Sequence, residues 1–180
     1  LKKEKKYRNK NYLNEIVQVL SDFDYQIDMK ILNAINYGVP QNRIRYIIVG
    51  IDRTLGLQFR VPSPTHASMH VSARKALEVP PIPESACNHE PTKHTQAVIE
   101  RLRHTKPGEN AWTANLPEHV KLNVKGARLS QIYKRLVADK PSYTITGKGG
   151  GGTYVYHWKE DRALTNREKA RLQAFPDDFE

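Results

Sequence analysis

Two arginines set two positions apart, Arg43 and Arg45, are the residues of this 180-residue sequence whose types and spacing best suit chemistry. They follow Gln41 and lead into residues 45–51, an almost uniformly apolar run that is typical of a strand buried on both faces. Side chains two positions apart on an extended segment face the same side. Two guanidinium groups on one side can hold a planar, oxygen-rich ligand through paired hydrogen bonds. The alternative is a pair of edge-strand arginines in surface salt bridges.

A glycine-rich segment, residues 144–153, is the second candidate. Glycine lets the backbone approach phosphates and base edges closely, and the hydroxyls of Thr144 and Thr146 can bond to them. A nucleotide phosphate loop requires serine or threonine after its lysine. Because Gly149 follows Lys148, that interpretation is excluded. A flexible linker remains the alternative, although linkers seldom carry β-branched and aromatic residues on both sides.

A capping-box pattern within residues 162–179 predicts a short helix. The Thr165 hydroxyl can accept a hydrogen bond from the amide of Glu168, whose carboxylate can reach back to the start of the helix. Leu172 and Phe175 then fall on one helical face, and the proline that follows is predicted to end the helix.

These segments resemble consecutive parts of one enzyme family. Residues 162–179 closely resemble motif IX of DNA cytosine-5 methyltransferases, the helix that steadies their target-recognition domain. Residues 38–45 resemble motif VIII, Gln-x-Arg-x-Arg entering a strand, and residues 144–153 resemble the DNA-recognition loop before motif IX. The resemblance implies an enzyme that flips a cytosine from the duplex and forms a covalent adduct at C6. The methyl group that it places on C5 comes from S-adenosylmethionine.

The resemblance also implies roles for single residues. Arg45 would reach O2 of the flipped cytosine, while Gln41 and Arg43 would help to shape the catalytic pocket. The implied DNA-binding residues of the recognition loop are Thr144, Thr146, Lys148, Gly149, Gly150 and Gly151. Lys134 and Arg135 are further candidates for phosphate contacts, although a solvated charged pair explains them equally well.

The charge of the chain favours a polyanionic partner. It has 29 Lys+Arg against 19 Asp+Glu, a net charge of +10 and a pI near 9.7. Neutralising phosphates releases condensed counterions, so duplex DNA is the expected partner. A basic but merely well-solvated protein is the alternative.

The cysteine and histidine content of the chain and its hydropathy exclude several further classes of protein. The single cysteine, Cys87, excludes an internal disulfide. Together with His89 and His94 it lacks a fourth ligand of suitable spacing, so we expect no metal site. No apolar run approaches the ~20 residues of a membrane span. We expect a protein of the bacterial cytoplasm, associated with the nucleoid.

Periodicity predicts regular structure in the first part of the chain. Helical spacing over residues 11–22, alternation over 25–31 and the apolar run 45–51 predict a helix and two strands at the edge of an α/β sheet. With the resemblance, residues 1–53 are expected to be the C-terminal part of a Rossmann-like methyltransferase domain.

The remainder is expected to be irregular. Prolines punctuate the chain after Arg53 and few windows show any period. A helix is predicted over residues 92–104 and a short strand over 142–146. We expect residues 54–180 to form a small, loop-rich mixed α/β target-recognition domain that includes the motif IX helix.

Family motifs that are missing limit what this chain can do alone. It has no cysteine in a Pro-Cys-Gln context, no Glu-Asn-Val glutamate and no glycine-rich cofactor loop after a first strand. Both ends, Leu1 and Glu180, look cut from a longer protein. We therefore expect the C-terminal part of a methyltransferase of a restriction-modification system, inactive alone, with the nucleophile and most of the cofactor pocket in an N-terminal half. The alternative is a non-catalytic DNA-recognition subunit of a split methyltransferase.

Overall fold

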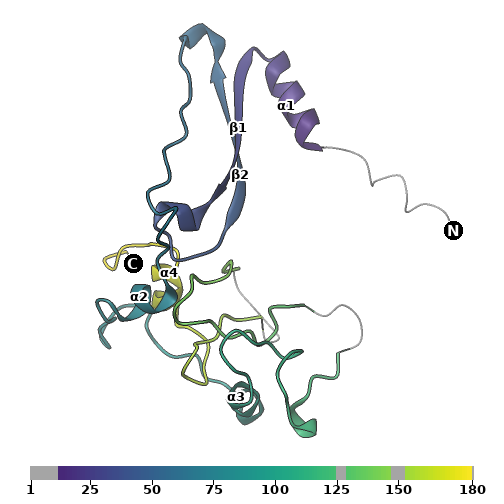
Figure 1. Ribbon diagram of the computed structural model, residues 1–180, viewed down its shortest axis with the longest axis vertical. Coiled ribbons are helices and arrows are strands. Elements are labelled where there is room, and N and C mark those ends of the chain that lie inside the picture. The colour runs from purple at the N-terminus through teal and green to yellow at the C-terminus, as the bar shows by residue number, and fades with distance from the viewer. Residues whose placement is uncertain (1–11, 125–128, 147–152, 180) are drawn as a thin grey trace, which may run out of the picture. The chain divides into compact units, whose positions relative to one another are not determined.

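The computed structural model describes residues 12–124, 129–146 and 153–179 (Figure 1). The chain forms two compact units. The first comprises residues 1–32 and 44–63, and the second comprises residues 33–43 and 64–180.

The first unit contains a helix and a two-stranded antiparallel sheet. Helix α1 spans Tyr12–Asp22, strand β1 spans Tyr25–Asn33 and strand β2 spans Ile44–Asp52. The turn between α1 and β1 closes where the Asp24 amide donates to the Ser21 carbonyl, with Asp24 in a left-handed conformation at φ 63°. The 3-10 turn η2, Arg53–Leu55, follows β2. The predicted helix and both predicted strands are therefore confirmed.

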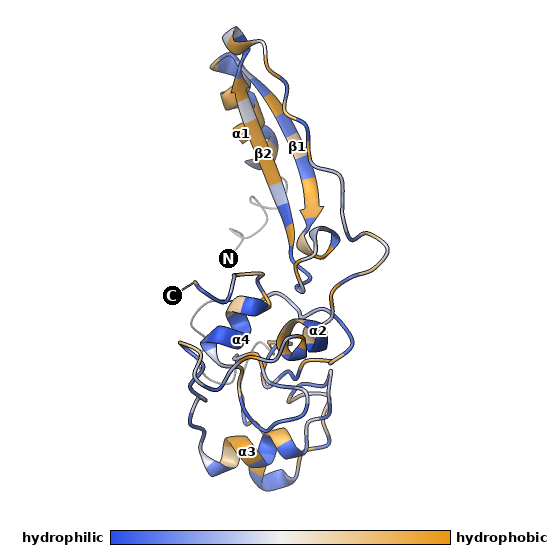
Figure 2. Ribbon diagram, turned by 90° about the vertical axis from the view of Figure 1, so that its left-hand side faces the viewer, coloured by the Kyte–Doolittle hydropathy of each residue, from blue (hydrophilic) through white to orange (hydrophobic). Residues whose placement is uncertain are grey.

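The prediction that the second strand is buried on both faces is wrong for this chain. Tyr46 on β2 is 58% exposed and Ile31 on β1 is 60% exposed. Apolar residues of α1 are exposed as well, among them Ile16 and Val19. Figure 2 shows the apolar colouring of β2 along most of its length. Two strands and one short helix have too little surface to cover both faces of the sheet.

The second unit is built from short helices and long loops around two apolar clusters. The helices are α2 (Ala73–Glu78), α3 (Gln96–Arg103) and α4 (Asn166–Arg171), with 3-10 turns η1 (Ala34–Tyr37) and η3 (Glu118–Val120). Leu77, Leu136, Ile145, Val155, Trp158, Leu164 and Leu172 belong to one cluster. Leu102, Leu116, Val120, Ile132, Tyr133 and Tyr156 belong to the other.

In this unit, buried arginine side chains donate hydrogen bonds to loop carbonyls that are not paired in a sheet. The described residues of this unit form isolated β-bridges. Apart from Asn33, the last residue of β1, none of them belongs to a strand. Loop carbonyls without a ladder still need donors when they are buried. Arg101 donates from Nε to the Val120 carbonyl at 2.7 Å, and Arg167 donates to the carbonyls of Cys87 and Phe179 at 2.9 and 2.8 Å. Part of the excess positive charge therefore stabilises the interior and is not available to a partner.

The predicted elements of the second unit have mixed outcomes. The helix expected over residues 92–104 is confirmed as the shorter α3, which begins after Thr95. The strand expected over residues 142–146 is wrong, because only Ser142 pairs, through an isolated parallel bridge with Gln41. No neighbouring strand is present among the described residues to extend that pairing.

Helix α4 has the predicted start but not the predicted end. The Glu168 amide donates to the Thr165 hydroxyl at 3.1 Å, and the Thr165 amide donates to the Glu168 carboxylate at 2.8 Å, so the capping box is confirmed. The helix ends at Arg171, well before Pro176, and Phe175 lies outside it. The left-handed conformation of Ala174 at φ 61° turns the chain there, so the proline does not end the helix.

Candidate nucleic-acid interface

The segment predicted to carry motif VIII is held in a tight, crowded turn. Gly38 caps η1 with φ 84°, and its amide donates to the Ala34 carbonyl. A side chain at this position would meet the ring of His66, whose Cε1 lies 2.9 Å from the place of a Cβ. Only glycine combines this left-handed backbone with so close a neighbour. Gln41, three residues on, is 1% exposed.

Three segments that are distant in sequence meet around Gln41. The Asn42 amide donates to the Ser142 carbonyl at 2.7 Å, and the Ser142 amide donates to the Pro40 carbonyl at 2.9 Å. The Thr144 hydroxyl donates to the Asn42 carbonyl at 2.9 Å. The structure thus places the predicted pocket residue Gln41 beside the start of the predicted DNA-recognition loop.

The third segment is the end of the motif IX helix. The side-chain amide of Gln41 donates to the Leu172 carbonyl at 3.4 Å. Its Oε1 atom is buried without a hydrogen-bond partner among the described residues, as is the hydroxyl of Ser142. Buried polar atoms that lack partners are unusual and often mark functional positions.

The two predicted arginines belong to different units. Arg43, in the second unit, is half-buried, and its amide donates to the Asn33 side chain at 3.1 Å. Arg45, in the first unit, is exposed, and its Nη1 donates to the Ile44 carbonyl at 2.6 Å. Neither guanidinium has an ion pair with a carboxylate in the described part of the chain. The ligand-binding face that the sequence predicted for this pair stays a prediction.

Part of the predicted DNA-recognition loop can be placed. Thr144 is half-buried and Thr146 is exposed. Lys148, Gly149, Gly150 and Gly151 lie outside the described residues. Thr146 lines a pocket of about 620 Å³ that also contains Lys169 and Gln173 of the motif IX segment. Burial lowers the pKa of Lys169, whose ammonium lies 5.8 Å from the centre of the Tyr154 ring.

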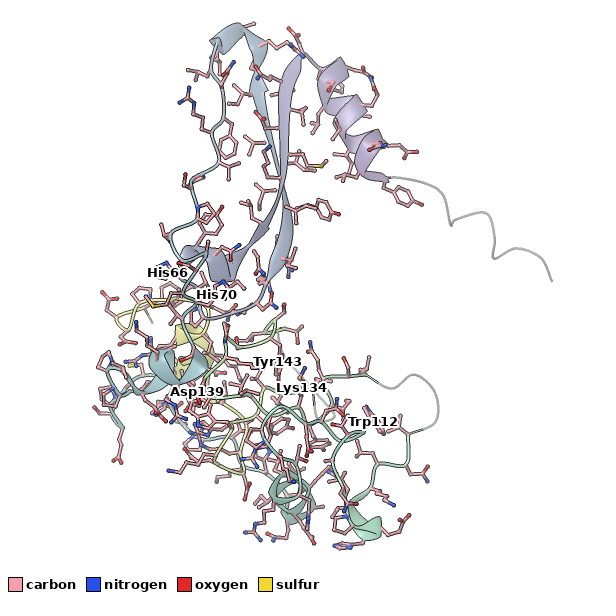
Figure 3. The ribbon with its side chains drawn as sticks, in the orientation of Figure 1. His66, His70, Trp112, Lys134, Asp139 and Tyr143 are labelled. Carbon is pink, nitrogen blue, oxygen red and sulfur yellow. The ribbon has the colours of Figure 1, made fainter. Side chains whose placement is uncertain are left out.

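Lys134 and Arg135 differ although they are adjacent. Lys134 is half-buried, and its ammonium lies 5.0 Å from the centre of the Tyr143 ring (Figure 3). Arg135 is 5% exposed, and its guanidinium is occupied inside the protein. It donates to the carbonyls of Leu102, Thr105, His157 and Glu160 and to the carboxylate of Asp161. Arg135 is therefore not available as a phosphate contact, because its guanidinium is buried and each of its three nitrogens already donates inside the protein.

The motif IX capping box is supported by a charged network. Arg162 donates to both carboxylate oxygens of Glu168 at 2.8 Å. Burial opposes ionisation of Glu168, but Arg162 and the Thr165 amide outweigh that penalty and hold the pKa of Glu168 below its usual value. His89 bonds to the Thr165 hydroxyl at 2.9 Å, and His94 accepts from the Ala163 amide at 3.0 Å. Both histidines thus fix the loop that leads into α4.

Sequence reasoning missed a basic cleft of about 320 Å³ in the second unit. Lys140, Tyr143 and Asn42 line it together with Lys134. Asn42 lies within the motif VIII match, but no pattern in the sequence indicated that it would face residues nearly a hundred positions away. The sequence did contain one signal of this cleft, namely the two lysines, Lys134 and Lys140, that precede the glycine-rich loop.

The fold is shared with a solved methyltransferase chain. The structure matches a solved chain described as a DNA modification methyltransferase encoded within a prophage of Escherichia coli, with a TM-score of 0.66 and 20% identity. The match covers 93% of this chain and 55% of that chain. The described residues contain no helix long and apolar enough to cross a membrane.

The sequence places the chain within one family. Residues 2–180 match the C-5 cytosine-specific DNA methylases, and the chain belongs to that family. It is 52% identical to the type II methyltransferase M.BbvI of Brevibacillus brevis, with 93% of this chain and 44% of that protein covered. It is 39% identical to the type II methyltransferase M.NgoFVII of Neisseria gonorrhoeae, with 94% and 47% covered. The chain therefore spans about half the length of these curated relatives.

Proposed function

We propose that this chain is the C-terminal part of a DNA cytosine-5 methyltransferase, in which it binds and reads duplex DNA and grips the flipped cytosine. The observation that carries this proposal is the meeting of three family segments around Gln41, namely motif VIII, the start of the recognition loop and the end of the motif IX helix. Duplex DNA is the partner, and the chain acts in the bacterial cytoplasm on the nucleoid, within a restriction-modification system.

In this proposal Arg45 contributes most when the ring becomes electron-rich. Attack at C6 of cytosine places negative charge on the ring, and a guanidinium at O2 stabilises that charge. Arg45 suits this role because it is exposed and has no carboxylate partner among the described residues. Gln41 and Arg43 would help to shape the catalytic pocket.

The nucleophile and the cofactor site are assigned to an N-terminal half. The single cysteine lies in Ala-Cys-Asn, and the turns after β1 and β2 carry no glycine-rich loop. S-adenosylmethionine would supply the methyl group from a pocket made mainly by that half. The exposed apolar residues of the first unit, such as Tyr46, Ile31 and Ile16, offer the surface on which it would pack.

A second candidate is the DNA-recognition subunit of a split methyltransferase. It is compatible with the absence of a Pro-Cys-Gln cysteine from these 180 residues. In both cases the chain works only with the N-terminal half, either in the same polypeptide or as a separate subunit.

Transfer of a labelled methyl group from S-adenosylmethionine tests the proposal. The chain alone should transfer no label to a cytosine-containing duplex. When it is joined to a family N-terminal half that carries the Pro-Cys-Gln cysteine, label should appear at C5 of cytosine. Label transfer by the pure chain, or none by the folded, joined protein on duplexes that cover all short target sequences, would contradict it.

A further inference from the structure

The basic cleft of the second unit has the chemistry of an anion site. Lys134, Lys140, Asn42 and Ser142 line it, and none of its lining residues, all of them described, is acidic. Two carboxylates are adjacent in sequence to lining residues: that of Asp139 is paired with Arg74 at 2.9 Å, and that of Glu109 accepts from the Lys106 amide at 2.9 Å. The positive charge of the cleft is therefore not neutralised from within the described residues.

The donors of the cleft are held in place by the fold. The Tyr143 hydroxyl donates to the Lys134 carbonyl at 2.8 Å, while the Lys134 ammonium lies over the Tyr143 ring (Figure 3). The side-chain oxygen of Asn42 accepts from the side-chain amide of Asn33 at 2.9 Å. The side-chain NH2 group of Asn42 is therefore left to donate elsewhere. The groups that converge here are thus mainly donors.

A buried hydroxyl supplies an independent observation. Ser142 is 0% exposed, and its Oγ has no hydrogen-bond partner among the described residues. A hydroxyl removed from water is normally paired, so an acceptor supplied by a ligand at the cleft would complete this site after a small adjustment. Phosphate oxygens are such acceptors and also carry the charge that the two lysines require.

We propose that this cleft binds one phosphate of the DNA backbone, with Lys134 and Lys140 as its charged contacts and Asn42 and Ser142 as neutral donors. The inference rests on the proposed function and deepens it. Because Thr144 donates to the Asn42 carbonyl, a phosphate held here fixes the DNA backbone beside the start of the recognition loop. Phosphate contacts set the register of a protein on DNA and do not read its sequence.

Equilibrium binding of a labelled cytosine-containing duplex to the full chain, measured over a series of salt concentrations, tests the cleft. The double variant Lys134→Met/Lys140→Ala should bind more weakly than the unaltered chain on every duplex sequence. The slope of log affinity against log salt should fall in magnitude by about 0.9, the value for one phosphate. Ser142→Ala should weaken binding roughly fivefold, as expected for one net hydrogen bond. Lys134→Arg should retain binding.

Controls separate this inference from the proposed function. Lys121→Ala removes the same charge from a lysine that is paired with Glu118 at 2.6 Å, and it should leave the salt slope unchanged. Urea midpoints should show that the cleft variants remain folded at the binding temperature. If the unaltered chain binds DNA and the folded double variant binds with the same affinity and slope, the cleft inference is wrong while the proposed function stands. If the unaltered chain binds no duplex at all, both are wrong.

Discussion

Replacing Arg135 with methionine should destabilise the second unit severely. The substitution keeps most of the aliphatic volume but removes a guanidinium that is bonded to four carbonyls and to Asp161. Each hydrogen bond to a charged group contributes about 1.5–3 kcal/mol, and the contributions do not add. Removing one partner of a buried ion pair costs about 3–5 kcal/mol. Because Asp161 is 31% exposed and can regain water, we expect about 3–4 kcal/mol for Arg135→Met.

Urea unfolding followed by tryptophan fluorescence measures this loss, since Trp158 is buried in the same unit. Lys134→Met is the matched control at the neighbouring position, where loss of a cation–π contact should cost about 0.5–1 kcal/mol. Arg135→Lys should fall between the two, because lysine keeps the charge but not the planar fork. An Arg135→Met chain that unfolds at the same urea concentration as the unaltered chain but binds DNA more weakly would refute this reasoning. Arg135 would then be a surface phosphate contact.

Two further substitutions test the fold around the site. Glu168→Gln should lower the unfolding free energy by about 2 kcal/mol at pH 7 by removing the charge that faces Arg162. The pKa of Glu168 is lower in the folded chain than its usual value, so this stabilisation is present above that usual value and is lost as the pH falls through the folded pKa. Urea midpoints of the two chains should therefore converge as the pH falls below the usual pKa of a glutamate and through the lowered pKa of Glu168, and a constant difference would contradict the assignment. Gly38→Ala should cost about 1–3 kcal/mol, since alanine at φ 84° is strained and its Cβ would meet His66. An unchanged urea midpoint would show that the turn relaxes freely.

Local patterns in the sequence predicted the helix and strands of the first unit and the start of α4, but not helix α2. The capping box of α4 depends on Thr165 and Glu168, three residues apart, and the helix and strands of the first unit depend on repeats within short windows. The same patterns wrongly predicted that β2 is buried on both faces, because burial depends on what packs over the strand. Tyr46 is apolar enough for an interior, yet it is exposed in this chain.

Long-range pairing accounts for the features that the sequence did not reveal. The site around Gln41 forms because residues 40–42 pair with Ser142, about a hundred positions later. Arg135 is buried because carbonyls from residues 102–105 and 157–160 converge on it, and no local pattern distinguishes it from Lys134. Family resemblance identified the segments that meet, whereas the basic cleft between them depended on their arrangement in space.

The measurement that most directly tests the central claim is turnover of the joined methyltransferase after Arg45→Ala. If Arg45 stabilises the charged cytosine ring, turnover should fall by about a hundredfold or more, the scale of losing one positioned donor. Affinity for duplex should change little, because phosphate contacts supply most of it. Lys148→Ala is the contrasting variant and should weaken DNA binding more than turnover. Turnover that survives Arg45→Ala while affinity alone falls would make Arg45 an ordinary phosphate contact and contradict the assignment.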